Sequence, residues 1–295
     1  MTKNLHLDHP EDIILTGNLE VLDWFSAIST ISVKMDGAPA IVWGTNPENG
    51  KFFVGTKSVF NKVKIKICYT PEDINNFYAH QPEVIDILLA CLDFLPRTNR
   101  IIQGDFIGYG GQSNYTPNTI TYDFGNRTDC GIVVCPHTEY TGTSLREGVA
   151  TPLTDVLESD ANVLFVQPTV DCLERFDSSV EQLRSSVEKS KFISEKTAKE
   201  VRIIINAFIK EGKSISPQLL EEIVGDRTLA ISYFQIIDLK EQMMDAMRIY
   251  DGPKAFIGDQ PIDCEGYVRH NKYGTMKLVD RYQFARANFN NQKFA

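Results

Sequence analysis

Lys34 is the first residue of the chain whose type and setting suggest chemistry. It lies in Lys34-Met35-Asp36-Gly37, where a strand-like run of β-branched residues enters a Gly-Ala-Pro turn. An ammonium group near a packed β surface needs a partner or a function, because burying an unpaired charge is costly. An environment that disfavours the charged form makes a lysine nucleophilic. The segment therefore indicates either a nucleophilic lysine or an ordinary surface lysine before a turn.

Further polar segments follow Lys34 in a fixed order. They are Gly55-Thr56-Lys57-Ser58, Gln103-Gly104-Asp105-Phe106-Ile107-Gly108, Glu265-Gly266-Tyr267-Val268-Arg269 and Met276-Lys277-Leu278-Val279. This order resembles that of the covalent nucleotidyltransferase superfamily, which comprises ATP-dependent DNA and RNA ligases and mRNA capping enzymes. The RNA ligases are the most similar, and the likeness runs from Ile31 to Val279 apart from a helical block. The two end motifs, Lys-x-Asp-Gly and Glu-Gly-Tyr-Val with Lys277, are its most specific parts.

The resemblance implies a fold, cofactors and an activity. The implied fold class is α+β, a nucleotidyltransferase (ATP-grasp-like) domain of two mainly antiparallel β-sheets with flanking helices, plus an α-helical insert. The implied cofactors are ATP and Mg²⁺ (or Mn²⁺). The implied activity is that of an ATP-dependent polynucleotide ligase, with RNA as the expected polynucleotide. AMP is first attached to a lysine and then passed to a 5′-phosphate on an RNA or DNA end.

Individual roles also follow from the resemblance. Lys34 is the implied nucleophile, which attacks the α-phosphorus of ATP and displaces pyrophosphate. At a pKa near 10.4 only about one lysine in 2,500 is uncharged at pH 7, so the attack needs a nearby cation or metal. Lys277 resembles the last-motif lysine, which neutralises charge on the α-phosphate. The implied metal ligands are Glu265 and Asp105, and the residues implied to bind the nucleotide are Lys34, Asp36, Gly37, Lys57, Asp105, Glu265 and Lys277.

The sequence departs from the family pattern at several positions. Asp105 stands where the family usually has glutamate, and Lys57 stands where it commonly has arginine, so reach and bidentate binding are reduced. Thr275 replaces the first lysine of a Lys-x-Lys motif, which leaves one cation fewer unless Lys272 or Arg269 compensates. No aromatic residue is identified for stacking on adenine. We expect Asp36 to fix the turn after Lys34 rather than to transfer a proton.

These departures leave two other functions open. The first is a catalytically reduced nucleotidyltransferase-like module for nucleotide binding or protein assembly, with the helical block as the surface for a protein partner. The second is transfer of AMP to an acceptor other than nucleic acid. The net charge of -9 permits such an acceptor, because nucleic-acid binders usually have a basic footprint.

Two kinds of sequence pattern predict the elements that would position these residues. Short strand-like runs separated by Gly, Pro, Asn and Asp extend from Ile31 to about Val170, and Asn49-Gly50 predicts a hairpin between two of them. The spacing of apolar residues predicts one helix within residues 82–96. Long helical periodicity follows from about 174, with Ser216-Pro217 as a helix start and Gly225 as a stop. The expected domains are 1–173 and 256–295 for the nucleotidyltransferase fold, with 174–255 as a helical insert.

Composition limits the class of protein. The 295 residues have 42% hydrophobic and 23% charged residues, without an apolar run long enough to span a bilayer. We find no secretory signal in the first thirty residues and expect a cytoplasmic location without membrane partners. Lys62, Lys64 and Lys66 alternate with apolar residues, which predicts three cations on one face of a strand, either solvated or guiding a phosphate backbone. Each histidine is expected to be an ordinary surface or loop residue.

Overall fold

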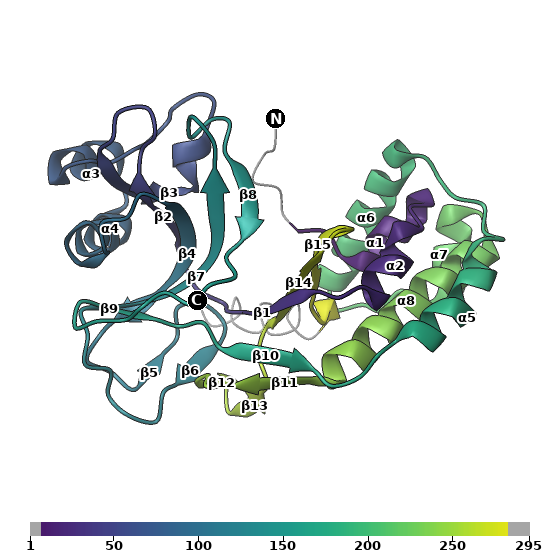
Figure 1. Cartoon of the computed structure of the whole chain (residues 1–295). Helices are drawn as coiled ribbons and strands as arrows, with labels where there is room; N and C mark the ends of the chain where they lie inside the picture. Colours follow the sequence, from purple (N-terminus) through teal and green to yellow (C-terminus); the bar gives the residue numbers. More distant parts are fainter. Residues whose placement is uncertain (1–6, 283–295) are drawn as a thin grey trace. The chain divides into compact units, whose positions relative to one another are not determined.

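The computed structural model describes residues 7–282 and divides the chain into two compact units. Unit 1 contains residues 35–168 and 251–262, and unit 2 contains residues 7–34, 169–250 and 263–282, counting described residues only. Both units combine helices with β-sheets, so the protein belongs to the α+β class (Figure 1). The expected boundary positions 173 and 255 lie near two of the crossings between units. The helical segment, however, shares unit 2 with strands from both ends of the chain.

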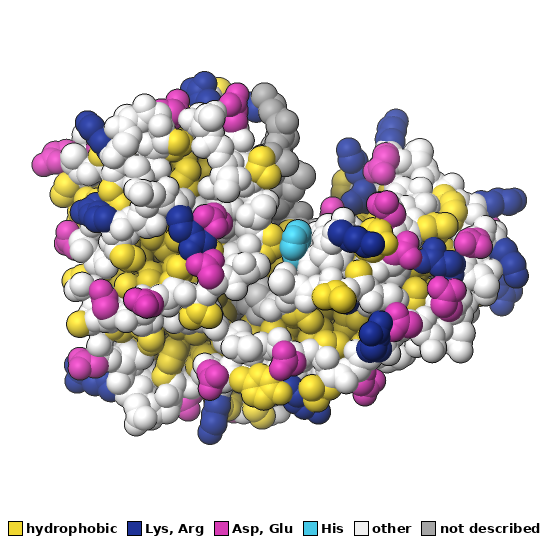
Figure 2. Space-filling model, viewed as in Figure 1, with side chains coloured by type: hydrophobic (Ala, Val, Ile, Leu, Met, Phe, Trp, Pro, Cys, Tyr) yellow, Lys and Arg dark blue, Asp and Glu magenta, His cyan; other side chains and the backbone are white. Residues whose placement is uncertain are grey.

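The helices of unit 2 confirm the prediction of helices from about residue 174 onward. They are α5 (Asp177–Val187), α6 (Glu195–Lys210), α7 (Pro217–Val224) and α8 (Arg227–Asp245). Ser216 Oγ accepts a hydrogen bond from the backbone N–H of Leu219 and begins α7, and Gly225 ends it with φ of 75°. On the face drawn in Figure 2, basic and acidic side chains are interspersed over these helices.

The amino-terminal segment adds short helices to unit 2. These are α1 (Pro10–Ile13), the 3-10 helix η1 (Ile14–Thr16) and α2 (Glu20–Ser26). Trp24 and Phe25 of α2 are almost completely buried, with exposed fractions of 0% and 1%. Arg184 of α5 donates a hydrogen bond to Asp23 at 2.6 Å, which ties α2 to the helical segment.

Two antiparallel sheets complete unit 2. The first has the order β1-β14-β15, from β1 (Thr30–Lys34), β14 (Gly266–Asn271) and β15 (Gly274–Leu278). The second pairs β10 (Thr169–Cys172) with β11 (Met247–Tyr250). The late return of strands, predicted from the sequence, is confirmed: β14 pairs with β1, a strand more than 200 residues earlier, and β15 pairs with β14.

Unit 1 is built on a six-stranded sheet with the path β3-β2-β4-β7-β8, on which β9 pairs in parallel with β7. The strands are β2 (Ala40–Thr45), β3 (Phe52–Thr56), β4 (Ile101–Tyr109), β7 (Ile132–Thr141), β8 (Val149–Pro152) and β9 (Val163–Phe165). The predicted hairpin is present between β2 and β3, and Gly50 has φ of 69° in its turn. The neighbouring strands β3, β2, β4, β7 and β8 are all antiparallel, as the short runs and turn residues indicate.

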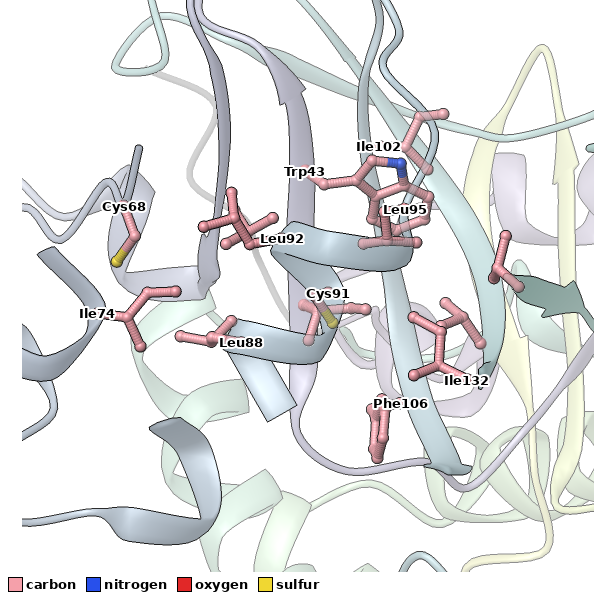
Figure 3. Close-up of a cluster of buried hydrophobic side chains, with 14 of the residues drawn as sticks. Trp43, Cys68, Ile74, Leu88, Cys91, Leu92, Leu95, Ile102, Phe106 and Ile132 are labelled. Carbon is pink, nitrogen blue, oxygen red and sulfur yellow. The ribbon is translucent and has the colours of Figure 1, made fainter. Parts of the chain in front are cut away.

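Helices α3 (Pro71–Phe77) and α4 (Pro82–Phe94) pack on one face of this sheet. Figure 3 shows Leu88, Cys91 and Leu92 of α4 in one buried cluster with Trp43 and Ile102 of the strands, and Leu88 lies beside Ile74 of α3. Since α4 falls within the predicted range 82–96, its apolar spacing correctly gave both the helix and its buried face.

A smaller four-stranded sheet in unit 1 has the order β13-β12-β6-β5. Its strands are β5 (Asn114–Tyr115), β6 (Thr121–Asp123), β12 (Lys254–Ile257) and β13 (Gln260–Ile262). Tyr122 of β6 is 1% exposed and anchors this sheet.

The predicted strand through Lys62, Lys64 and Lys66 is wrong. Residues 61–67 form a loop after the 3-10 helix η2 (Lys57–Phe60), and Lys64 has φ of 56°, which is incompatible with a strand. Val63 is 77% exposed, so the alternating apolar residues do not line a buried face. The alternation predicted a strand, but this segment forms no ladder with a neighbouring strand.

Within residues 7–282, no helix has both the length and the apolar composition needed to cross a membrane.

Candidate functional site

The register of β1 and β14 brings Lys34 to Glu265. Lys34 ends β1 and lies opposite Gly266, the first residue of β14. Its Nζ donates a hydrogen bond to Oε1 of Glu265, a residue 231 positions later in the chain. The side chains are 32% and 14% exposed, respectively. The pair is therefore shielded but still reachable from solvent.

Gly266 has a steric reason to be glycine. Its φ is 152°, and a Cβ at this position would lie 2.3 Å from the carbonyl oxygen of Leu278. Any side chain would displace the backbone of β15. Because Gly266 is the direct partner of Lys34, the position across from the lysine carries no side chain.

Lys277 lies on the same face of this sheet as Lys34. Val268 is the direct partner of both Ser32 in β1 and Lys277 in β15. Directly paired residues share a face, as do alternate residues of one strand. Burial lowers the pKa of Lys277, and the positive charges of Lys34 and Arg281 lower it further. The sheet thus holds two lysines and one glutamate, all three predicted as site residues, on or next to one face.

A histidine neighbours Thr275, the position where the first lysine of the Lys-x-Lys motif is missing. Thr275 Oγ1 is 2.7 Å from Nδ1 of His270, its direct partner across β14 and β15. Both residues are on the face that carries Lys277, since Thr275 and Lys277 alternate along β15.

The two cations considered as replacements are placed otherwise. Arg269 is buried and donates hydrogen bonds to the carbonyl oxygens of Phe25 and Ala27 at 2.9 and 2.7 Å, so it caps the end of α2. Lys272 lies in the turn between β14 and β15, with Nζ 4.9 Å from the centre of the Tyr273 ring. The expectation that Arg269 could turn toward a phosphate is therefore wrong, because its donors are engaged on the opposite face of the sheet.

A buried ionic network lies in the same unit and was not predicted. Lys240 Nζ donates to Glu11 Oε1 at 2.8 Å, and the two side chains are 3% and 0% exposed. Arg281 donates to Asp12 at 2.9 Å and to the Tyr233 hydroxyl at 3.2 Å. Lys240 lies on the buried face of α8. A lysine among the apolar positions of this helix is the sequence signal that could have revealed the network.

His9 lies in the loop before α1, as expected, but its side chain is largely shielded from solvent. Its side chain is 13% exposed, and its Nδ1 is 3.8 Å from Oε1 of Glu11. Burial holds the pKa of His9 far below its ordinary value, and the charges of Arg281, Lys277, Lys240 and Lys34 act in the same direction. His9 is therefore neutral at physiological pH. His6 lies outside the described residues.

The amino-terminal segment is attached directly to β15. The carbonyl oxygen of Asp8 accepts a hydrogen bond from the backbone N–H of Lys277 at 3.1 Å, and Asp8 forms a parallel bridge with Met276. The backbone of Lys277 is thus held from both sides, by β14 and by Asp8.

In unit 1, Asp36 has a structural role. Its carboxylate accepts hydrogen bonds from the Asn118 side chain and from the backbone N–H groups of Thr119 and Ile120, at 2.9, 2.9 and 3.3 Å. Its backbone N–H donates to the Tyr122 hydroxyl at 2.5 Å. Asp36 therefore fixes the loop at 118–120, whereas we expected from the sequence that it would fix the turn that follows Lys34.

Gly37 and Asp105 lie against each other in unit 1. A Cβ on Gly37 would be 2.6 Å from Cβ of Asp105 and 3.0 Å from the carbonyl oxygen of Phe106, so only glycine permits this approach. His137 Nε2 is 3.7 Å from Asp105 Oδ1. His137 falls in an irregularity of the β4–β7 ladder, where one residue of β7 is skipped. Such bulges redirect side chains, and this explains why a sequence pattern alone did not select His137.

Lys57 is the first residue of η2, directly after β3, and is exposed. It belongs to unit 1 with Asp36, Gly37 and Asp105, whereas Lys34, Glu265 and Lys277 belong to unit 2. The predicted site residues therefore form one group in each unit.

Neither group is a closed metal site. Among residues 7–282, no three His, Cys, Asp or Glu side chains are grouped closely enough to hold a metal ion. Mg²⁺ is usually held by one or two carboxylates together with substrate phosphates. Glu265, whose carboxylate lies beside Lys34, fits that kind of site.

The sequence matches a family described as a family of unknown function (DUF6267), over residues 4–226 and 223–293. Neither the curated proteins nor the solved structures yielded a significant match.

Proposed function

The chain belongs to the DUF6267 family, and we propose that it is an ATP-dependent covalent nucleotidyltransferase of the ligase type, with Lys34 as the residue that carries AMP. The contact between Lys34 and Glu265 carries this proposal. It joins the first and the fourth of the segments singled out in the sequence, and Lys277 of the last segment shares the sheet face. A chance set of motifs has no reason to converge in this way.

In the proposed first step, the uncharged Nζ of Lys34 attacks the α-phosphorus of ATP. A P–N bond forms, the P–O bond to the β-phosphate breaks with its electron pair, and pyrophosphate leaves. The ammonium form must first lose a proton, and the Glu265 carboxylate in contact with Nζ is a suitable acceptor. In the second step, an acceptor phosphate oxygen attacks the same phosphorus, a P–O bond forms and the P–N bond breaks, and the Lys34 amine leaves with the proton returned by Glu265.

Lys277 suits the stabilisation of charge in both steps. Negative charge spreads over the oxygens of the phosphoryl group during transfer, and a fixed cation stabilises it most in a shielded environment. The lowered pKa of Lys277 reflects such shielding. Bound Mg²⁺ would add charge neutralisation at the phosphates, with Glu265 as its protein ligand.

The residues of unit 1 support the proposal through their chemistry. Asp105 and His137 offer a carboxylate and an imidazole side by side, which suit the hydroxyl groups of a ribose. Lys57 offers an exposed ammonium for a phosphate oxygen. Gly37 permits the close approach of Asp105, and Asp36 fixes the loop at 118–120.

The test is incubation of the pure protein with Mg²⁺ and ATP labelled at the α-phosphate, followed by a denaturing gel and intact mass. We expect the wild type to retain one AMP, and Lys34→Ala and Lys34→Arg to retain none. Arginine keeps a positive charge beside Glu265, but its guanidinium stays protonated and cannot act as the nucleophile. Lys189→Ala, at an exposed lysine of unit 2, is the matched control and should label normally. Label that persists in the Lys34 variants would overturn the proposal.

A second function, nucleotide binding without covalent transfer, is favoured by one observation. Where the nucleotidyltransferase pattern has the first lysine of its Lys-x-Lys motif, this chain has Thr275 hydrogen-bonded to His270. Tight ATP binding by the wild type, without an adduct in Mg²⁺ or Mn²⁺, would support this module and exclude the transferase.

A further inference from the structure

The lysines of unit 1 are concentrated in one segment. Between Glu48 and Glu72 the chain has five lysines and no acidic residue, although its net charge is -9. These are Lys51, Lys57, Lys62, Lys64 and Lys66. In an acidic protein, a polyanion can be held only where cations gather locally. This segment is such a place.

The loop at 61–66, here called the lysine loop, is closed at its base. The carbonyl oxygen of Ser58 accepts hydrogen bonds from the backbone N–H groups of Asn61 and Lys66, at 3.2 and 3.4 Å. Both ends of the loop therefore meet at one residue. Lys62 and Lys64 between them are exposed, and so is Val63.

Lys66 holds the loop rather than presenting charge. Its Nζ donates to the carbonyl oxygen of Phe77 at 2.7 Å and lies 4.3 Å from the centre of the Tyr78 ring. The Tyr78 hydroxyl is hydrogen-bonded to the hydroxyls of Thr56 and Ser58 at 3.0 and 2.9 Å. The base of the loop is thus fixed to α3, and Lys62 and Lys64 extend from a rigid support.

Lys64 adopts a backbone conformation that lysine rarely takes. Its φ of 56° lies in the left-handed region, which costs a residue with a Cβ about 1–2 kcal/mol. Glycine or asparagine would adopt it more readily. Backbone strain of this kind is concentrated at functional sites, where the surrounding structure holds the strained conformation.

We propose that the lysine loop binds the sugar-phosphate backbone of a single-stranded polynucleotide through Lys62 and Lys64. That this polynucleotide is the acceptor of AMP rests on the proposed function, but the binding itself does not. Two exposed ammonium groups two residues apart, with no acid between Glu48 and Glu72, suit consecutive phosphates.

The test is fluorescence anisotropy with a 5′-phosphorylated, labelled single-stranded RNA oligomer and with the DNA oligomer of the same sequence, over a range of salt concentrations. Each lysine–phosphate contact on a single strand releases about 0.7 counterion. Lys62→Gln/Lys64→Asn should therefore lower the salt slope by about 1.4 and weaken binding roughly 25-fold at 0.1 M salt. Asparagine at 64 removes the charge and tolerates the left-handed conformation.

The matched control is Lys189→Gln/Lys191→Gln, two exposed lysines with the same spacing in a loop of unit 2. It has the same charge change and should leave the salt slope unchanged. Equal losses in the two double variants, an unaffected loop variant, or a wild type that binds neither oligomer would each overturn the inference. A preference between the oligomers identifies RNA or DNA as the partner.

Self-adenylylation, measured in parallel, separates this inference from the proposed function. We expect the loop variant to acquire AMP at the wild-type rate, because the loop is not part of the nucleotide site. If the wild type binds the oligomer but forms no adduct, the loop assignment stands and the transferase falls.

Discussion

Two lysine–glutamate pairs in unit 2 have the same chemistry and opposite surroundings. Lys240–Glu11 is sealed, with side chains 3% and 0% exposed, and Lys34–Glu265 is accessible, with side chains 32% and 14% exposed. In the sealed pair each ion depends on the other, because water cannot replace a lost partner. In the accessible pair water can replace either partner at little cost.

The difference separates structure from chemistry. A lysine that must exchange its carboxylate partner for a phosphorus atom cannot sit in a sealed pair. Lys34 at the end of β1, next to a residue without a side chain, has the required access. Lys240, on the buried face of α8, lacks this access. The same pairing therefore suits the proposed nucleophile in one place and supports the fold in the other.

The largest expected effect concerns the sealed pair. Lys240→Met leaves Glu11 in a buried position without its closest cation, at a cost of about 3–5 kcal/mol of unfolding free energy. Lys34→Met should cost less than about 1 kcal/mol, since its pair is partly solvated. Urea denaturation of both variants measures the difference between their losses of unfolding free energy. Equal losses would remove the basis of the comparison.

Asp36 tests whether a residue of the predicted site can belong to the fold. Its carboxylate receives one side-chain and two backbone hydrogen bonds from residues 118–120. Asp36→Ala should lower the unfolding free energy by about 1–3 kcal/mol, since hydrogen bonds to a charged group are lost. Asp105→Ala, beside it in unit 1, is the control and should cost less. If Asp36→Ala is as stable as wild type, the carboxylate is held for chemistry instead.

His9 sharpens the comparison because cations from both pairs lower its pKa. The folded state keeps His9 neutral, whereas the unfolded state takes up a proton below pH 6.5. Its contribution to stability is thus lost as the pH falls, by about 1.4 kcal/mol per pH unit below that value. Urea unfolding at pH 7, 6 and 5 should show a smaller loss in His9→Gln than in wild type. Parallel losses would show that His9 titrates normally in the fold.

Local patterns predicted much of the fold. The apolar spacing of residues 82–96 identified α4, and Asn49-Gly50 identified the hairpin, because both depend on neighbouring residues. The alternation of lysines and apolar residues at 62–66 wrongly predicted a strand, because a strand also needs a neighbouring strand to pair with. Lys66 instead packs on Tyr78, and Lys64 turns the backbone.

The sequence selected candidate site residues where residue order carries information, and it did not select residues that depend on packing alone. Lys34, Glu265 and Lys277 came from ordered motifs, and β1, β14 and β15 bring them to one sheet. The sealed network joins residues more than 200 positions apart with no motif around them, so it emerges only from the packing of α1 on α8. His137 depends on a bulge, which leaves no mark in the residue pattern.

The most direct measurement is peptide mapping by mass spectrometry of the wild type after incubation with ATP and Mg²⁺. The account predicts that one AMP is carried by the peptide that contains Lys34, and that fragmentation places it on that side chain. AMP on any other residue, including Lys240, or no AMP on the protein with either metal, would contradict it.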